Sequence, residues 1–169
     1  MKYKICQICA IEFTYNKFIR QVVEKLVEEE IDVTAVFTWE FSDKSPSQKG
    51  VKFKNIEIRR SINILSLFKS IYRFYFFFRN EKFDLIEVHS PIASIIVRIA
   101  AKLAGCNKVV YKVHGFYFHE YMPIFLRFFH ISIEFLLSKL TNTILTVSKE
   151  DYVITSILGM KNPKKINYL

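Results

Sequence analysis

The amino-acid sequence predicts an α/β domain with a Rossmann-like, doubly wound parallel sheet of about seven strands. One pattern along the chain leads to this fold class. Short apolar and β-branched segments alternate along the chain with longer segments whose apolar residues recur at helical spacing. Such alternation is typical of a parallel sheet whose right-handed crossovers cover both faces. With 169 residues the chain can bury a substantial core, and we expect residues 1–169 to form one domain.

The individual elements follow from composition and spacing. We expect strands at residues 3–10, 31–38, 51–58, 84–89, 108–113, 142–147 and 164–169. We expect helices at residues 16–30, 61–80, 92–104 and 123–140, and a further helix after Ser148. Polar loops are expected at residues 12–16 and 42–50. Gly105 is placed to end a helix, and Ser148 with Asp151 has the spacing of a capping box.

The composition excludes several classes of protein. Hydrophobic residues make up 51% and charged residues 24%, which excludes a disordered chain and a coiled coil. The formal net charge of +9 predicts an anionic partner, either nucleic acid, anionic lipid or a phosphorylated substrate, unless the surface is simply basic. The N-terminus lacks the features of a signal peptide and no apolar run is long enough to span a bilayer, so we expect a cytoplasmic protein.

The three cysteines do not predict a disulfide framework or a metal site. Cys6 and Cys9 form a C-x-x-C motif, but both lie in the first expected strand, where residues three apart face opposite sides of a sheet. Neither a second cysteine pair nor other zinc-ligand spacing accompanies them. We therefore expect a reducing compartment, no metal and no cofactor.

Three of the four histidines fall in loops at the expected ligand-binding edge. In open α/β sheets, ligands bind beyond the carboxyl ends of the strands where the strand order reverses, here between the first and fourth strands. His89, His114 and His119 lie in those loops, where a histidine can bond a sugar hydroxyl or a phosphate. Gly115 allows a ligand to approach His114 closely, whereas His89 could equally be a satisfied strand-end residue. We expect His119 on the surface and His130 in packing.

Motifs for other chemistries are missing from the sequence. No glycine-rich dinucleotide fingerprint follows the first strand, and no P-loop occurs anywhere. No G-x-S-x-G nucleophile elbow and no paired-carboxylate signature are present. These absences argue against a dinucleotide-binding protein, a P-loop enzyme and a serine hydrolase, and they predict a chain without a self-sufficient catalytic apparatus.

Two expected helices carry basic and aromatic residues together. Residues 52–82 contain eight Lys and Arg but only two acidic residues, beside a broad apolar face, and residues 117–135 have a similar character. Such surfaces suit the headgroup boundary of an anionic membrane, although both faces could also pack on the sheet. Nucleic acid is not expected, because the aromatic residues lie on helices rather than on strands. The membrane contacts that we expect are Arg60, Phe68, Lys69, Arg73, Phe76, Phe125 and Arg127.

Three sequence blocks carry a family resemblance over nearly the whole chain. Residues 83–91 are FDLIEVHSP, residues 109–118 are VVYKVHGFYF, and residues 145–151 are LTVSKED. In their order and spacing they resemble the N-terminal domain of glycosyltransferases of family 4 type. The resemblance is greatest to the enzymes that build capsular or exopolysaccharide repeat units. Many relatives carry Gly-Gly in the first loop, where this chain has Glu12-Phe13-Thr14-Tyr15.

The resemblance implies a GT-B fold, in which two Rossmann-like domains face each other across a cleft. The N-terminal domain binds the acceptor, often a lipid-linked sugar at the cytoplasmic membrane face, and the C-terminal domain binds the nucleotide-sugar donor. Transfer proceeds with retention, usually without a metal. The histidine of the His-Gly motif, near the reacting sugar, corresponds to His114, which we expect to be catalytic. The substrate contacts that we expect are Thr14, His89, Ser90, Gly115, Phe116 and Ser148.

The leading hypothesis is therefore the acceptor-binding half of a transferase, peripheral on the inner face of the cell membrane. Its expected partners are a lipid-linked or oligosaccharide acceptor, a nucleotide sugar, an anionic membrane surface and a donor-binding domain or subunit. That second domain is expected to be absent from these 169 residues, so the chain alone should be inactive. Two alternatives stay open: a non-catalytic split or degenerate half that docks on a membrane or subunit, and an unrelated Rossmann-like binding protein.

Overall fold

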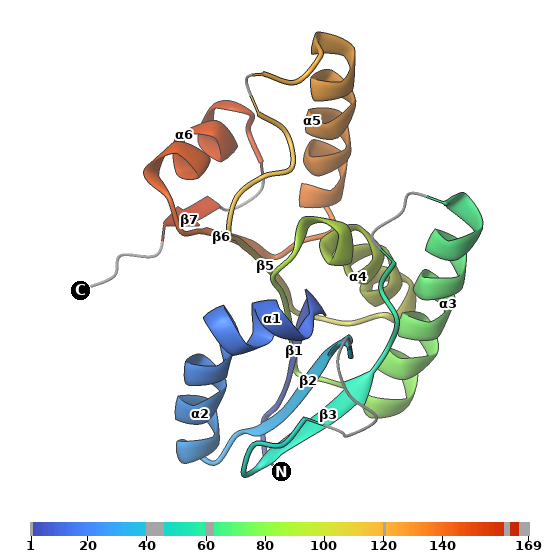
Figure 1. The fold of residues 1–169 in the computed structure, drawn as a ribbon, viewed down its shortest axis with the longest axis vertical. Helices are drawn as coiled ribbons and strands as arrows, with labels where there is room; N and C mark the ends of the chain where they lie inside the picture. Colours follow the sequence, from blue (N-terminus) through green and yellow to red (C-terminus); the bar gives the residue numbers. More distant parts are fainter. Residues whose placement is uncertain (1, 40–45, 60–62, 120, 161–162, 166–169) are drawn as a thin grey trace.

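A single parallel sheet forms the centre of the molecule. The computed structural model describes residues 2–39, 46–59, 63–119, 121–160 and 163–165. Its seven strands follow the order β3-β2-β1-β4-β5-β6-β7, and every neighbouring pair is parallel (Figure 1). The predicted fold class is thus confirmed. The strands are β1 (Lys4–Ile11), β2 (Asp32–Thr38), β3 (Val51–Asn55), β4 (Leu85–Val88), β5 (Val109–Val113), β6 (Thr143–Thr146) and β7 (Pro163–Lys165).

Helical segments connect most of the strands. They are α1 (Glu12–Thr14), the π-helical turn η1 (Tyr15–Ile19), α2 (Arg20–Glu28), α3 (Ile64–Glu81), α4 (Pro91–Ala104), α5 (Ile124–Ser138) and α6 (Lys149–Ile157). Two predicted helix ends are confirmed. Gly105 ends α4 in the left-handed conformation, with φ of 76°. The Ser148 hydroxyl accepts a hydrogen bond of 3.0 Å from the backbone N–H of Asp151 at the start of α6.

The prediction of a polar loop at residues 12–16 is wrong, because the chain turns into helix directly after β1. Tyr15 and Ile19, one turn apart, are both buried in this segment. The Tyr15 ring stacks on Phe37 of β2, with 5.1 Å between the ring centroids. Burial of both side chains against the sheet stabilises the wider π-turn, a geometry that often occurs at functional sites. Of the other predicted loop, residues 42–45 lie outside the described residues.

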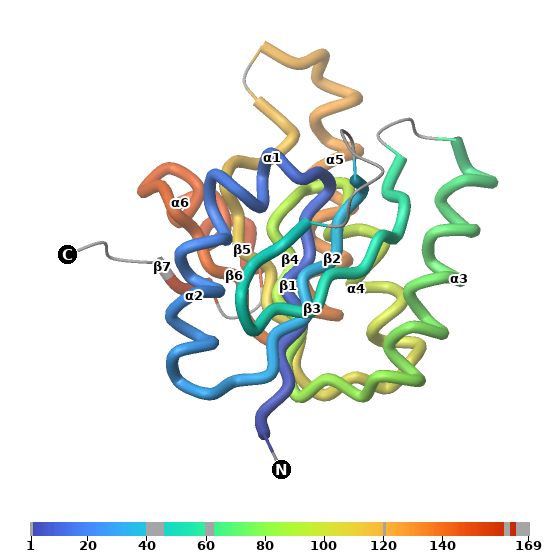
Figure 2. Tube along the Cα trace, turned by 60° about the horizontal axis from the view of Figure 1, so that its bottom comes forward, coloured from blue at the N-terminus to red at the C-terminus, as the bar shows by residue number. Residues whose placement is uncertain are grey.

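Two apolar clusters lie on opposite faces of the sheet. The larger one joins α3 and α4 to strand residues such as Cys6 and Ile86. The smaller one joins η1 and α2 to strand residues such as Cys9 and Val33. Cys6 and Cys9 therefore face opposite sides, as predicted, and both are buried free thiols. Figure 2 shows α2 on one side of the strands and α3 and α4 on the other.

A buried ion pair fastens α5 to α4. Arg98 of α4 is fully buried, and its Nη2 lies 2.7 Å from Oε2 of Glu134 on α5. The same guanidinium donates to the backbone carbonyl and the hydroxyl of Ser94, and it stacks over the Tyr111 ring at 4.5 Å. A guanidinium away from water needs such partners, because isolated burial of a charge is very unfavourable. The position of α5 therefore depends on Glu134.

We expect Glu134→Leu to lower the free energy of unfolding by about 3–5 kcal/mol, because it leaves the buried Arg98 without its counter-charge. Urea denaturation followed by circular dichroism measures this change. The double variant Arg98→Met/Glu134→Leu should lose clearly less, because no charge then remains unpaired. Glu24→Leu, on the exposed face of α2, is the matched control and should change stability by less than about 0.5 kcal/mol. Equal losses in the single and double variants would contradict this account.

Candidate functional site

The strand order reverses between β1 and β4, and the chain segments that leave these two strands are held together there. The backbone N–H of His89 donates to the carbonyl of Ile8 at 2.9 Å. One step further, the backbone N–H of Ala10 donates to the Ser90 hydroxyl, also at 2.9 Å. These bonds fix the start of α4 against the end of β1. The predicted ligand-binding edge is therefore formed by segments that are firmly joined.

His114, which directly follows β5, contacts residues from both of these segments. Its Nε2 lies 3.2 Å from Nδ1 of His89, and the two imidazole rings are stacked with 5.5 Å between their centroids. On its other side the ring contacts Phe18 of η1, at 4.8 Å between centroids. Two of the three loop histidines singled out in the sequence are thus brought together at the reversal point. His119, by contrast, is exposed, as expected.

Beneath the two histidines, a pair of polar strand residues continues the hydrogen bonding into the sheet. Gln7 of β1 and Glu87 of β4 are register partners, and Nε2 of Gln7 donates to Oε2 of Glu87 at 2.8 Å. Oε1 of Gln7 lies 2.6 Å from Nε2 of His89. His89 is only 2% exposed and both of its ring nitrogens have partners. This matches the strand-end arrangement that the sequence left open, and any contact of His89 with a ligand stays a prediction.

The surroundings favour neutral imidazoles at this site. Burial, followed by the proximity of His114 and of Lys112, holds the pKa of His89 well below its ordinary value. Burial and then the Lys112 cation also lower the pKa of His114. At neutral pH each ring therefore offers one donor and one acceptor nitrogen. A pair of neutral histidines can orient polar substrate groups without adding net charge to the site.

The other predicted substrate contacts lie at the same edge, and most of them have a structural role. Gly115 has a φ of 126°, a backbone conformation that residues other than glycine rarely adopt. The Phe116 ring stacks on Phe118, with 4.9 Å between the centroids. Ser148 caps α6, and the neighbouring Val147 N–H donates to the β5 carbonyl just before His114. Thr14 is half-buried at the end of α1. Their contact with substrate stays a prediction.

Sequence reasoning missed Gln7, Glu87, Lys112 and Phe18 as members of this site. A signal existed for the first three, because polar residues inside strands that are buried on both faces are unusual and need a partner. Glu87 is half-buried, and Gln7 and Lys112 are almost fully buried. Phe18 gave no such signal, since its contact with His114 depends on the π-turn that the sequence did not predict.

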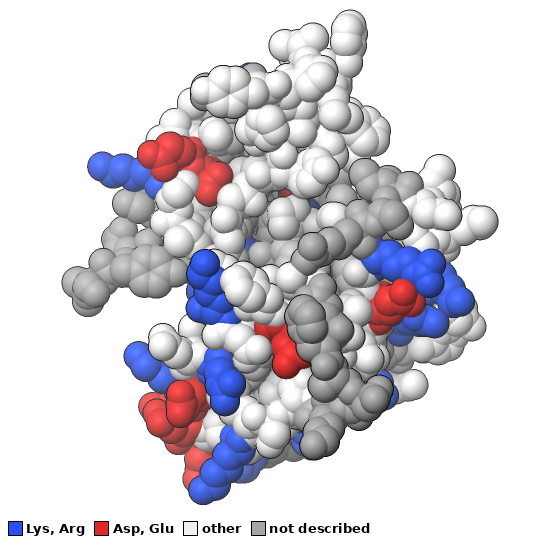
Figure 3. Space-filling model, in the orientation of Figure 1, with Lys and Arg blue, Asp and Glu red and all other residues white. Residues whose placement is uncertain are grey.

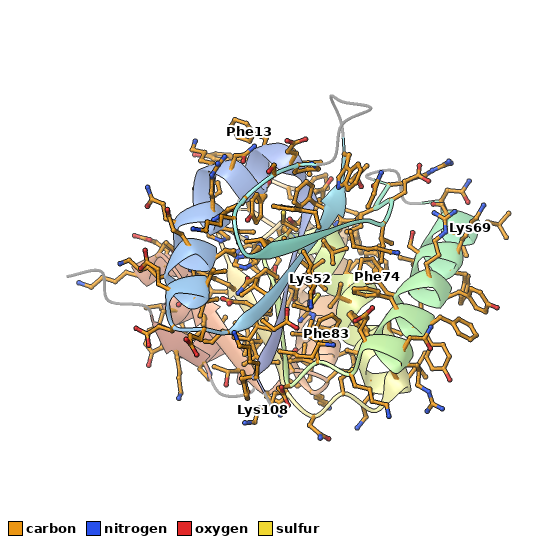
Figure 4. The ribbon with its side chains drawn as sticks, turned by 90° about the horizontal axis from the view of Figure 1, so that it is seen from below. Phe13, Lys52, Lys69, Phe74, Phe83 and Lys108 are labelled. Atoms are coloured by element: carbon orange, nitrogen blue, oxygen red, sulfur yellow. The ribbon has the colours of Figure 1, made fainter. Side chains whose placement is uncertain are left out.

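The residues predicted to contact a membrane lie mainly on two exposed helix faces. On α3, Phe68 and Phe76 are exposed apolar residues, and Lys69 and Arg73 are exposed basic residues beside them. In Figure 4, Phe74 points from α3 toward the sheet, whereas Lys69 projects away from it. On α5, Phe125 is 87% exposed. Arg127 is half-buried, and Arg60 lies outside the described residues.

The surface over α5 differs in character from that over α3. Figure 3 shows almost no charged side chains over α5, at the top, whereas Lys and Arg gather over α3, at the right. The exposed large apolar side chains of the two helices are Ile64, Leu65, Phe68, Tyr72 and Phe76 on α3, and Ile124, Phe125, Leu126, Phe128, Phe129, Phe135 and Leu136 on α5. Large exposed apolar patches on soluble proteins are typical of interaction surfaces.

An apolar groove of about 400 Å³ lies between α3, α4 and α5. Ile92 and Ile95 of α4 and Ile133 of α5 contribute to its walls, and Arg59 lies at its edge. Its lining also includes Pro91 and Tyr117, close in sequence to the histidines of the site. The groove therefore begins at chain segments that closely follow the two site histidines, at the start of α4 and in the loop after β5.

The described part of the chain contains neither a candidate metal site nor a candidate membrane-spanning helix. No group of three or more His, Cys, Asp or Glu side chains among them is placed to hold a metal ion. None of their helices combines the length and the apolar character that crossing a bilayer requires.

Comparison with known proteins identifies the class of this fold. The chain superposes with a TM-score of 0.67 on the apo form of the lipopolysaccharide outer core galactosyltransferase WaaB, at 13% identity, covering 95% of this chain and 44% of that one. At this identity the likeness defines the fold, which is that of one Rossmann-like half of a GT-B protein.

Sequence relatives give the family. The sequence profile described as glycosyl transferase 4-like matches residues 7–148, and this chain belongs to that family. It is 31% identical over 110 residues to UDP-Gal:alpha-D-GlcNAc-diphosphoundecaprenol alpha-1,3-galactosyltransferase of Escherichia coli, covering 65% of this chain and 28% of that protein. It is 31% identical over 84 residues to EpsD of Bacillus subtilis (strain 168), provisionally named a glycosyltransferase, covering 48% and 22%. The chain thus spans roughly a quarter of these relatives.

We expect the free energy of unfolding to fall as the pH drops from ~7.5 to ~5.5. Because the folded chain lowers the pKa of both His89 and His114, their stabilisation is complete above the unfolded pKa of about 6.5 and is lost below it. The loss should approach about 1.4 kcal/mol per pH unit from His89, with a further part from His114.

Urea unfolding at a series of pH values measures this dependence. His119→Ala is the control variant, because His119 is exposed and makes no hydrogen bond to either site histidine. It should keep the same pH dependence. A free energy of unfolding that stays constant over this pH range would contradict the account of two buried neutral histidines.

Proposed function

We propose that this chain is the acceptor-binding half of a glycosyltransferase that transfers a sugar from a nucleotide sugar to a lipid-linked saccharide. The proposed setting is cell-surface polysaccharide biosynthesis, with the enzyme peripheral on the cytoplasmic face of the cell membrane. The observation that carries the proposal is the position of His114. In a chain of the glycosyl transferase 4-like family, it lies at the reversal point of the sheet and is held by His89 and Phe18.

In this proposal His114 lies beside the reacting sugar and orients it. The ring is half-buried and its pKa is lowered by burial and by Lys112, so a neutral imidazole is available for hydrogen bonding. A donor-binding domain would close the cleft from the other side and supply the nucleotide sugar. Transfer with retention of configuration and without a metal belongs to the same proposal. Because the chain covers only 28% and 22% of its curated relatives, we expect it to be inactive without that second domain.

A lipid-linked acceptor fits two features of the surface. The lining of the apolar groove between α3, α4 and α5 includes Pro91 at the start of α4 and Tyr117 in the loop after β5, which closely follow His89 and His114 in the chain. A hydrocarbon chain along the groove would therefore keep the attached saccharide close to His114. The Escherichia coli relative is named for an acceptor of this kind, a diphosphoundecaprenol-linked sugar.

Contact with an anionic membrane fits the exposed faces of α3 and α5. Aromatic side chains suit the boundary between headgroups and acyl chains, and Lys69 and Arg73 beside them suit acidic headgroups. Such contact would place the groove at the level where a lipid-linked acceptor is found.

We expect His114→Ala to lower kcat by about 10²-fold or more when it is made in the enzyme that joins this chain to its donor-binding domain. The reason is that the variant removes a hydrogen-bonding group beside the reacting sugar. Transfer of radiolabelled sugar to a lipid extract measures activity, and urea unfolding of the same variant measures stability.

The matched control for this experiment is His119→Ala, which should keep full activity, because His119 is an exposed loop residue. The unfolding free energy of His114→Ala should fall by about 1–3 kcal/mol, because the variant leaves Nδ1 of the buried His89 without its partner. Unchanged turnover would remove His114 from the mechanism. It would favour the alternative of a non-catalytic half that docks on a membrane or a subunit.

We expect the chain to bind vesicles that contain phosphatidylglycerol at low salt and to dissociate as salt rises, because charge attraction to the headgroups is screened. Neutral phosphatidylcholine vesicles should retain less protein. Vesicle co-sedimentation measures both effects. Phe68→Ser/Phe76→Ser should weaken binding, whereas Leu103→Ser, equally exposed but at the far end of α4, is the control and should not. Loss of binding in the control alone, or no binding at low salt, would rule out this surface.

A further inference from the structure

The buried amide of Gln7 can adopt only one orientation at this site. Its Nε2 lies 2.8 Å from Oε2 of Glu87. The opposite orientation would place the amide oxygen against a carboxylate oxygen, where no hydrogen is available to join them. The amide group therefore donates to Glu87 and directs its oxygen toward His89.

The orientation of Gln7 determines which nitrogen of His89 carries the hydrogen. The Gln7 oxygen only accepts, so Nε2 of His89 must be the donor in their 2.6 Å contact. Oε1 of Glu87, 4.0 Å from the same nitrogen, favours a hydrogen there as well. Because the lowered pKa of His89 keeps the ring neutral, its Nδ1 is left with a lone pair.

The same reasoning extends to His114. Nδ1 of His89 lies 3.2 Å from Nε2 of His114 and can only accept, so Nε2 of His114 must donate. A neutral His114 then carries no hydrogen on Nδ1. This nitrogen makes no hydrogen bond to any of the described residues, and the ring is half-buried at the edge where the strand order reverses. An imidazole in this state offers one unused acceptor to a ligand.

We propose that Glu87, Gln7 and His89 are positioning residues that fix His114 in the tautomer protonated on Nε2, so that its Nδ1 accepts a hydrogen bond from a substrate hydroxyl. Fully ionised phosphate oxygens have no hydrogen to donate and are poor partners for this nitrogen. The identification of the hydroxyl as that of a sugar rests on the proposed function. The direction of the hydrogen-bond chain rests on the geometry alone.

The tautomers can be observed directly in this chain, without any transferase assay. Long-range ¹H–¹⁵N correlation spectra of the ¹⁵N-labelled chain distinguish protonated from unprotonated imidazole nitrogens. The spectra are recorded at pH ~7.5, where an imidazole with a lowered pKa is neutral. We expect His89 and His114 each to be protonated on Nε2 only. The exposed His119, which makes no hydrogen bond to either site histidine, serves as the reference in the same spectrum. A His114 protonated on Nδ1, or on both nitrogens, would overturn the proposal.

Variants test whether the buried residues cause this state. In Gln7→Leu/Glu87→Leu both polar partners become apolar, so His89 loses its fixed tautomer and a measurable population of Nδ1-protonated His114 should appear. In the nearly isosteric Glu87→Gln, residue 87 can also donate, so Gln7 can take either orientation and the same mixture is expected. Thr146→Val is the control: its buried hydroxyl has no hydrogen-bond partner among the described residues, and both tautomers should stay as in the natural chain.

The outcomes separate this inference from the proposed function. A single Nε2 tautomer of His114 in the double variant would show that the three buried residues do not control it. If that variant does not fold, Glu87→Gln and the natural chain still decide the matter. Excess inorganic sulfate, whose oxygens carry no hydrogen at pH ~7.5, should leave Nδ1 of His114 unprotonated, and protonation on adding it would overturn the preference for a hydroxyl. None of these results depends on whether the chain takes part in sugar transfer.

Discussion

The reversal of strand order between β1 and β4 is the constraint on which the rest of this structure depends. Neighbouring parallel strands whose connections run in opposite directions leave their carboxyl ends free of a crossing loop, so a ligand can approach there. The chain reinforces this edge with two hydrogen bonds between the end of β1 and the segment that leaves β4, which join Ile8 to His89 and Ala10 to Ser90. The position of His114 beside them follows from the pairing of β5 with β4.

Burial of the polar residues at the centre of the sheet is unfavourable, so their presence there needs an explanation other than packing. A single buried amide or imidazole without a hydrogen-bond partner in this position would lower the stability of the protein by about 1–3 kcal/mol. Here the side chains form one continuous hydrogen-bond chain, which runs through Glu87, Gln7, His89 and His114 in that order. Because well-packed apolar residues often replace a buried polar set without loss of stability, stability alone does not account for a hydrogen-bond chain that ends in a ring at the ligand-binding edge. Orientation of that ring does account for it.

The sequence predicted the features that depend on local composition and missed those that depend on register. The alternation of strands and helices, the opposite faces of Cys6 and Cys9, and the histidines near the reversal point all follow from spacing along the chain. The contact between Gln7 and Glu87 needs the pairing register of two strands eighty residues apart. The ion pair of Arg98 with Glu134 needs the packing of two helices, and the π-turn at Tyr15 needs the tertiary burial of its ring. No local pattern contains this information.

The arrangement of polar and apolar surface supports one kind of acceptor over others. His89 of the polar site is closely followed by Pro91 of the groove, at the start of α4, and the loop after β5 contributes His114 to the site and Tyr117 to the groove. A wholly polar oligosaccharide would use the histidines and leave the groove and the faces of α3 and α5 exposed to water. A saccharide on a hydrocarbon carrier would contact both surfaces. Its polar saccharide would lie at the histidines while the attached hydrocarbon chain lies in the adjacent groove. The proximity of these two surfaces is therefore the strongest structural argument for a lipid-linked acceptor.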